Sequence, residues 1–267
     1  MSRESEIKQI IEDLKNHLEF QKSMGVERVS IQKTVREETP PKAPEKEPVK
    51  PEETMAAKKT HREDIIKVEE QIDMFGSASK KMTLEEIKKE LENSMASKQY
   101  EGSTQIVFGE GNPKARLVFV GEAPGRDEDI QGRPFVGRAG QLLNKIIEAM
   151  GLKRSDVYIS NIVKSRPPDN RTPTPEEMAA WEPYLFQELR TIEPDVVVCL
   201  GSTAAQSILK TKMSLGSLRG KFHRYGKIKI MVTYHPAALL RNPAYKKPLW
   251  EDMQMVMKEL GISKKGD

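Results

Sequence analysis

LVFVG at residues 117–121, followed at once by EAPG at 122–125, is the stretch that decides the fold. Three more apolar, β-rich runs come after it, at 156–163, 195–201 and 228–236. Apolar residues at helical spacing predict helices between and after these runs, over 138–150, 174–192, 202–210 and 243–260. Continuous apolar strands that alternate with helices are typical of a parallel sheet covered on both faces. We therefore predict an α/β protein, a three-layer α/β/α sandwich around a central, mainly four-stranded parallel sheet.

A functional site is expected where the parallel strands deliver their carboxyl ends. Four places qualify: the turn that starts at Gly121, Asn161 in the second strand, Gly201 after the third and His235 after the fourth. An asparagine amide donates and accepts hydrogen bonds at once, as the reading of a base edge requires. His235 is followed by Pro236, which restricts its backbone. Two polar groups at one edge of a sheet point to a shared site.

Composition excludes several classes of protein. The 267 residues include 37% hydrophobic and 31% charged residues, and the N-terminus has no apolar leader. No run reaches the roughly 20 apolar residues of a membrane span. The single cysteine, Cys199, rules out a disulfide framework, a four-thiolate zinc site and a cysteine-ligated iron–sulfur cluster. We expect a cytoplasmic protein.

The chain divides near residue 80. Residues 1–80 predict an extension with a short helix at 5–24, an extended Pro/Lys/Glu-rich linker at 39–53 and a second short helix at 62–70. Residues 81–267 predict a catalytic domain, which opens at the capping box of Thr83 and Glu86 with a helix through about Met95. Residues 1–80 hold 15 Lys and Arg against 17 Asp and Glu, a net charge of −2, which leaves 29 against 23, or +6, for the rest. That basic excess suits a polyanionic partner.

GEAPGRDEDIQGRPFVGRAGQ at 121–141 is the most informative loop. It places acidic and basic side chains and the aromatic Phe135 directly after a strand. It contains neither a dinucleotide-binding G-x-G-x-x-G nor the G-K-[ST] of a phosphate-binding loop. A solvated turn with one buried phenylalanine is the alternative interpretation. After His235, the loop AALLRNP offers Leu239 and Leu240 either as a hydrophobic staple into the last helix or as an apolar wedge for a base stack, with Arg241 on a phosphate.

Five blocks, in this order and spacing, resemble a family 4 uracil-DNA glycosylase, from about Val107 to Leu260. They are GEAPGRDEDIQGRPFVGRAGQLL, NIVKSRPPDNRTPTPEE, LGSTAAQSIL, LRGKF and YHPAALLRNP. The resemblance implies a monofunctional DNA-repair glycosylase that flips uracil out of DNA, hydrolyses its N-glycosidic bond and leaves an abasic site. A catalytically weak DNA-binding or clamp-recruited accessory protein derived from such an enzyme is the alternative.

The resemblance also implies roles for single residues. Asn161 matches the asparagine that reads uracil, Phe135 the aromatic that stacks on it, and His235 the histidine that stabilises the departing base. Glu122 and Glu128 match acidic positions of the first motif, and water is expected to be positioned by backbone carbonyls and by Glu122 or Glu128. The uracil-binding turn would comprise Gly121, Ala123, Pro124 and Gly125. The residues expected to contact DNA are the intercalating Leu239 together with Arg241, Arg138 and Ser202.

One departure from the family concerns its cofactor. Typical members hold a four-cysteine iron–sulfur cluster, and the matching positions here are Ser94, Ser97, Ser165 and Trp181. Neither a hydroxyl nor an indole replaces a thiolate ligand. We therefore expect no cofactor and no metal. A covalent uracil-trapping relative would need a histidine in the loop after Asn161, and a zinc deaminase would need H-x-E and P-C-x-x-C; the sequence has neither.

The peptide QIDMF at 71–75 lies near the end of the N-terminal extension. Gln71, Ile72, Met74 and Phe75 fit the Q-L-[SD]-L-F pattern with which bacterial proteins dock on the polymerase sliding clamp. A flexible tether there would raise the effective concentration of the enzyme on DNA. The apolar face of a short helix that docks on the domain is the alternative. The expected partners are uracil-containing DNA and a sliding clamp, for a monomer that does not bind membranes.

Overall fold

The structure is a computed structural model that describes residues 81–94, 96–98 and 100–262. The features predicted for residues 1–80, including the clamp peptide at 71–75, lie outside this range. Within it, no helix is long and apolar enough to cross a membrane.

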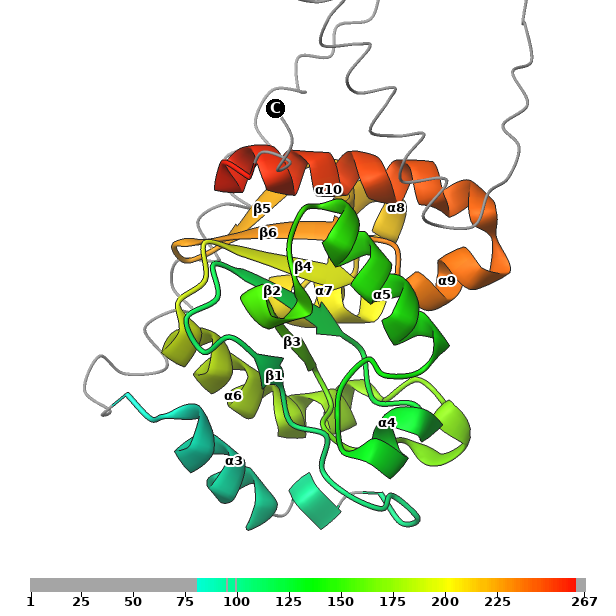
Figure 1. The fold of residues 1–267 in the computed structure, drawn as a ribbon. Helices are drawn as coiled ribbons and strands as arrows, with labels where there is room; N and C mark the ends of the chain where they lie inside the picture. The colour runs from blue at the N-terminus through cyan, green and yellow to red at the C-terminus, as the bar shows by residue number, and fades with distance from the viewer. Residues whose placement is uncertain (1–80, 95, 99, 263–267) are drawn as a thin grey trace, which may run out of the picture.

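A six-stranded sheet in the order β1-β3-β2-β4-β6-β5 forms the centre of the molecule (Figure 1). Its strands are β1 (Glu110–Gly111), β2 (Leu117–Gly121), β3 (Tyr158–Asn161), β4 (Val196–Leu200), β5 (Phe222–Tyr225) and β6 (Ile228–Thr233). The four predicted strands are the parallel ones, β3, β2, β4 and β6. The two antiparallel edge strands, β1 and β5, were not predicted. β1 has only two residues and β5 reads FHRY, so neither presents a continuous apolar run.

The alternation of side chains along each strand produces two separate cores. Val118 and Val120 of β2 belong to one buried cluster, and Leu117 and Phe119 belong to the other. The first cluster includes side chains of α3 (Leu84–Glu92), α6 (Pro175–Ile192) and α7 (Ser202–Leu209). The second includes side chains of α5 (Arg138–Ala149), α9 (Pro236–Arg241) and α10 (Lys246–Leu260). Helices thus cover both faces of the sheet, and the predicted three-layer sandwich is confirmed.

The helix ends follow local chemistry. Thr83 and Glu86 form the predicted capping box, with Thr83 N donating to Glu86 Oε2 at 2.7 Å. The helix then ends at Glu92 rather than near Met95, with Asn93 as its cap. The last helix, expected over 243–260, is present as α10 at Lys246–Leu260, and the first three residues of the expected range, Pro243–Tyr245, form a 3₁₀ turn. The short helix α9 before it was not predicted as a helix. It is separate from the 3₁₀ turn because Pro243 has no N–H with which to continue it.

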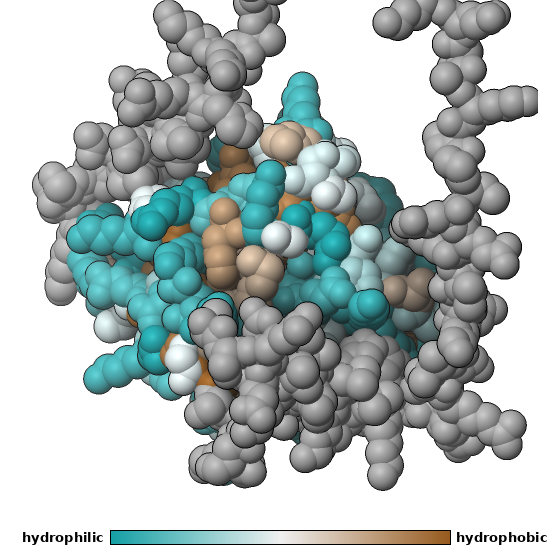
Figure 2. Space-filling model, turned by 90° about the horizontal axis from the view of Figure 1, so that it is seen from above, coloured by the Kyte–Doolittle hydropathy of each residue, from teal (hydrophilic) through white to brown (hydrophobic). Residues whose placement is uncertain are grey.

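Figure 2 looks down on the molecule from the side of α10, and the visible described surface is mostly hydrophilic with small apolar areas. This agrees with the burial of Leu249, Trp250, Met253 and Val256, which turn the apolar face of α10 inward. The structure also contains the short helices α4 (Arg126–Gln131) and α8 (Leu215–Leu218).

Candidate active site

The strand register brings the four predicted places to one edge of the sheet. Gly121 pairs with Asn161 across β2 and β3, and Leu200 pairs with Thr233 across β4 and β6. Gly201 follows with a left-handed φ of 97°, a conformation that favours glycine. A Cβ at Gly201 would stand 3.4 Å from the Cβ of His235. The turn after β2, the end of β3, the start of α7 and His235 are therefore neighbours.

Phe135 enters this edge from the loop between α4 and α5. Its ring centroid lies 5.6 Å from that of His235, with 33° between the ring planes. A Cβ at Gly121 would stand 2.5 Å from Phe135 Cζ and 2.4 Å from Asn161 Oδ1, so only a glycine leaves room for both side chains. Phe135, Asn161 and His235 are thus brought together. The ring of Phe135 is also buried and belongs to the second core cluster, as in the alternative interpretation of this loop.

Asn161 carries a buried acceptor that lacks a donor. The residue is 2% exposed, and Oδ1 has no hydrogen-bond partner among the residues that the structure describes. An unsatisfied buried acceptor is costly, so it is a strong candidate for a contact with a ligand. The backbone is held in place, because Lys164 Nζ donates to Asn161 O at 2.9 Å.

His235 is set up as a neutral hydrogen-bond donor. It caps α9, and its Nδ1 accepts a hydrogen bond from Ala237 N at 3.1 Å. A neutral ring that accepts at Nδ1 carries its proton on Nε2. Burial, and secondarily the positive charge of Arg241, lower the pKa of His235 to about 4. At neutral pH the ring is therefore uncharged, with Nε2–H available as a donor.

The two glutamates of the first motif have different environments. Glu128 Oε1 accepts hydrogen bonds from Val136 N at 3.0 Å and Gly137 N at 2.9 Å, while Oε2 accepts one from Gly125 N at 3.2 Å. This carboxylate therefore links the turn at Gly125 with the chain after Phe135. The half-buried Glu122 has no side-chain partner among the described residues, so its carboxylate stays available.

The leucines after His235 differ from the expectation that Leu239 is exposed for insertion into DNA. Leu239 is 1% exposed and packs in the core cluster that includes Leu143, so as it stands it is not a wedge. The neighbouring Leu240 is 43% exposed, because consecutive residues of a helix point in different directions. Arg138, Ser202 and Arg241 are exposed, at the starts of α5 and α7 and the end of α9. Pro124 is buried and Ala123 half-buried within the turn.

Sequence reasoning missed an arginine and a buried ion pair near the site. Arg154 donates from Nη2 to Pro134 O at 2.6 Å and from Nη1 to Phe135 O at 3.2 Å, which ties the phenylalanine loop to the start of β3. No sequence signal marks it, because it lies in a polar turn. Lys164 and Glu188 form an ion pair of 2.8 Å with both side chains fully buried. The position of Lys164 directly after the apolar Ile162 and Val163 was a sequence signal that could have predicted a buried, paired lysine.

The four cluster positions do not fit an iron–sulfur cluster. Ser94 Oγ donates to Leu91 O at 2.7 Å, and Ser97 Oγ donates to Ser94 O at 2.6 Å. Ser165 Oγ donates to Ser103 Oγ at 2.8 Å, and the Trp181 side chain is fully buried in the first core. The three serine hydroxyls thus donate hydrogen bonds to neighbouring protein oxygens, and the indole of Trp181 is packed in the core, so none of the four side chains offers a thiolate ligand. The only thiol, that of Cys199, is buried in β4, and burial raises its pKa.

The sequence was compared with known proteins. The profile of the "Uracil DNA glycosylase superfamily" matches residues 108–254. A type-4 uracil-DNA glycosylase of Archaeoglobus fulgidus is 43% identical over 182 residues, which cover 65% of this chain and 92% of that protein. A type-4 uracil-DNA glycosylase of Thermotoga maritima is 51% identical over 141 residues, 52% of this chain and 73% of the relative. A type-5 uracil-DNA glycosylase of Pyrobaculum aerophilum is similar at 34% identity over 153 residues, 49% of this chain and 66% of that protein.

Proposed function

This chain belongs to the type-4 uracil-DNA glycosylases of the uracil-DNA glycosylase superfamily, and from that premise we propose how its own residues act. It is a DNA-repair hydrolase that excises uracil and leaves an abasic site. The single observation that carries the assignment of the site is the unpartnered, buried Oδ1 of Asn161 beside Phe135 and His235.

Asn161 selects the base. Uracil presents an N–H donor next to a carbonyl acceptor, which an asparagine amide matches through Oδ1 and Nδ2. Cytosine presents an acceptor and a donor in the reverse order, so its entry would leave buried polar groups unpaired. A site built to hydrogen-bond one edge rejects the mismatched edge strongly. Phe135 supplies the apolar surface on which the flipped base stacks.

His235 stabilises the leaving group. Breaking the N-glycosidic bond leaves negative charge on the oxygens of uracil. The neutral imidazole donates from Nε2–H, because Ala237 N holds the proton off Nδ1. A donor that is already oriented and partly desolvated stabilises developing charge without reorganisation.

Glu122 is the carboxylate that we assign to the attacking water. It lies one residue beyond Gly121, and its side chain has no protein partner within the described part of the chain. Glu128 braces the loops instead. The backbone carbonyls of Gly121 and Glu122 already accept from Ile162 N and Val163 N, so they pair β2 with the chain after β3.

DNA would be held by exposed groups around this edge. Arg138, Arg241 and the start of α7 at Ser202 suit phosphate contacts, since cations and helix N-termini both attract anions. Leu240 replaces Leu239 in this proposal as the side chain that fills the gap left by the flipped nucleotide, because only Leu240 is exposed.

Cleavage of a uracil-containing oligonucleotide, followed by alkaline scission at abasic sites, tests the function. Wild type should cleave, and Asn161→Ala and His235→Ala should slow cleavage by about two orders of magnitude or more, as for the loss of one preorganised donor. Lys153→Ala, a change in the polar turn before β3, serves as a control and should cleave normally. A normal rate for His235→Ala, or an inactive wild type, would contradict the proposal. The second result would favour a catalytically weak DNA-binding protein.

We further propose that this enzyme works without the family's cluster. A series of hydrogen bonds supports this idea. Ser165 Oγ donates to Ser103 Oγ, and Ser103 Oγ donates in turn to Asp129 Oδ1 at 3.1 Å. Thr104 N donates to the same oxygen of Asp129 at 2.9 Å. These bonds connect the segment before β1 with α4 and with the loop after β3. Trp181 adds buried apolar area to the first core.

The clamp partner, the monomeric state and the cytoplasmic location are also proposals. The support for clamp binding is the fit of Gln71, Ile72, Met74 and Phe75 to the docking pattern. Purified sliding clamp should retain the full-length chain and release a Gln71→Ala/Phe75→Ala variant; equal retention of both would remove the idea. A DNA substrate agrees with the cytoplasm of a cell without a nucleus.

A further inference from the structure

Phe135 holds its ring at the site from a strained backbone. Its φ is 51°, in the left-handed region that bulky residues rarely adopt. Such a conformation persists only when the surroundings enforce it, and it is found most often at functional sites. The question is therefore which groups hold this loop.

Three contacts fix the peptide groups around Phe135. The two backbone N–H groups that follow Phe135, those of Val136 and Gly137, donate hydrogen bonds to the Glu128 carboxylate. Gly140 of α5 approaches so closely that a Cβ there would stand 1.9 Å from Phe135 O. On the carbonyl side, Arg154 donates to both Pro134 O and Phe135 O.

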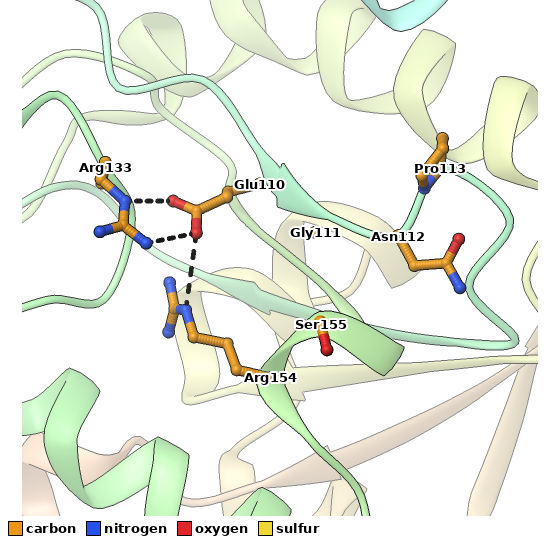
Figure 3. A pocket seen from close by; sticks show the side chains of 7 residues that line it. All are labelled: Glu110, Gly111, Asn112, Pro113, Arg133, Arg154 and Ser155. Atoms are coloured by element: carbon orange, nitrogen blue, oxygen red, sulfur yellow. Dashed lines mark hydrogen bonds and ion pairs between the residues drawn. The ribbon is translucent and has the colours of Figure 1, made fainter.

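Arg154 is itself held in place. Its Nε lies 3.8 Å from Glu110 Oε1, as Figure 3 shows. Its guanidinium also donates to Asn144 Oδ1 at 3.0 Å. Its side chain is 22% exposed and lines a surface pocket of ≈ 630 Å³ with Glu110 and Arg133. The hydrogen bond with Arg133 lowers the pKa of Glu110, which therefore stays anionic.

Arg133 provides a natural comparison. It donates to the same Glu110 in a bidentate pair, at 2.7 and 2.6 Å, yet its side chain is 55% exposed. Within the described residues, both of its side-chain hydrogen bonds go to Glu110 and not to the carbonyls of the Phe135 loop. Two arginines thus share one carboxylate, and the carbonyls of Pro134 and Phe135 are bound by Arg154.

We propose that Arg154 is a positioning residue for uracil excision: it holds Phe135 in its left-handed conformation, so that the ring faces the base beside Asn161 and His235. The inference rests on the proposed function, because it assigns Phe135 to the base. An ångström of misplacement in a reacting geometry can lower a rate by about 100-fold.

The first experiment compares Arg154→Met with Arg133→Met in the full-length protein. For Arg154→Met we expect single-turnover cleavage to slow by about 10- to 100-fold, and inhibition by free uracil to weaken by a similar factor. Affinity for DNA that already contains an abasic site should stay within about twofold, because that DNA offers no base for Phe135. Arg133→Met should match wild type in all three measurements. Arg154→Lys, which can still donate to Pro134 O, should recover part of the loss.

A double-mutant cycle separates positioning from general destabilisation. If Arg154 acts through the ring of Phe135, Arg154→Met should have little further effect on uracil inhibition in a Phe135→Leu background. An equal loss in both backgrounds would overturn the proposal, as would an Arg154→Met variant that melts earlier but binds uracil normally.

An NMR measurement that does not depend on cleavage distinguishes a failure of this proposal from a failure of the proposed function. The ring current of Phe135 acts on His235 at 5.6 Å, so Arg154→Met should shift the His235 Cε1–H resonance and Arg133→Met should not. An unchanged resonance would count against positioning. Failure of wild type to cleave, with the resonance shifted as expected, would contradict only the proposed function.

Discussion

His235 shows how one environment sets the protonation of a single side chain. Burial and Arg241 lower its pKa to about 4, against 6.5 for a free histidine. As pH falls through 6.5 the unfolded chain takes up a proton that the folded chain does not. The contribution of the uncharged His235 ring to the unfolding free energy is therefore complete above pH 6.5 and is lost as the pH falls towards 4.

We predict that the His235 ring signals stay constant between pH 8 and 5.5 in NMR spectra of the folded protein. Chemical denaturation should show the stability difference between wild type and His235→Ala shrinking by at most about 3 kcal/mol between pH 7 and pH 4. His223 of the edge strand β5, whose Nε2 lies 2.7 Å from Leu218 O, provides a second histidine signal for comparison. A midpoint for His235 near pH 6.5 would contradict the buried environment.

Leu239 and Leu240 illustrate how neighbouring residues separate into core and surface. Leu239→Ala should cost about 2–5 kcal/mol of unfolding free energy, because it empties a core position. Leu240→Ala should leave stability within about 0.5 kcal/mol, as for an exposed site, and slow uracil excision from duplex DNA. Thermal melts and single-turnover rates measure the two effects. A large loss of stability from Leu240→Ala, with duplex cleavage unaffected, would reverse the assignment.

At the level of secondary structure elements, the end of β3 is tied to α6 through a buried charge pair. Lys164 Nζ donates to Glu188 Oε2 at 2.8 Å, to Ser160 Oγ at 2.6 Å and to Asn161 O. Burial lowers the pKa of Lys164, and the charge of Glu188 opposes that shift. The network holds the backbone of Asn161 against a helix that lies on one face of the sheet.

Removal of one partner should leave an uncompensated buried charge. We predict that Glu188→Ala lowers the unfolding free energy by about 3–5 kcal/mol at pH 7 in urea denaturation. The control is Lys229→Ala, which breaks an ion pair between β6 and α10 whose side chains are about one-third exposed. That change should cost no more than about 1 kcal/mol. Equal losses in the two variants would show that Lys164 is not held as a charged group.

For the molecule as a whole, the question is whether the protein is stable without a cluster, given that Ser94, Ser97, Ser165 and Trp181 occupy the positions of its ligands. We predict that protein purified without oxygen contains substoichiometric iron and lacks the broad visible absorbance of a cluster, and that a chelator leaves its melting temperature unchanged. Protein carrying about four iron atoms per chain would contradict this. The matched control replaces all four residues by cysteine under the same conditions.

Much of this architecture could be predicted from local patterns. Each of the four parallel strands is an apolar run, so periodicity located them, and the capping box of Thr83 located the start of α3. The edge strands β1 and β5 were not predicted, because an edge strand needs neither great length nor a continuous apolar sequence. The last helix was located to within one turn, because Pro243 begins a 3₁₀ turn before α10, and the short helix α9 that Pro236 begins was missed.

The order of apolar runs and turns along the chain was enough to establish the fold class, to predict which residues meet at one edge of the sheet, and to reveal the likeness in which Asn161, Phe135 and His235 stand out. Which leucine is buried, which glutamate braces a loop and which arginine holds Phe135 became visible only in three dimensions. The reason is physical. Strand and helix periodicity is a property of consecutive residues, whereas burial, hydrogen-bond partners and a shifted pKa depend on side chains that the fold brings together from distant positions.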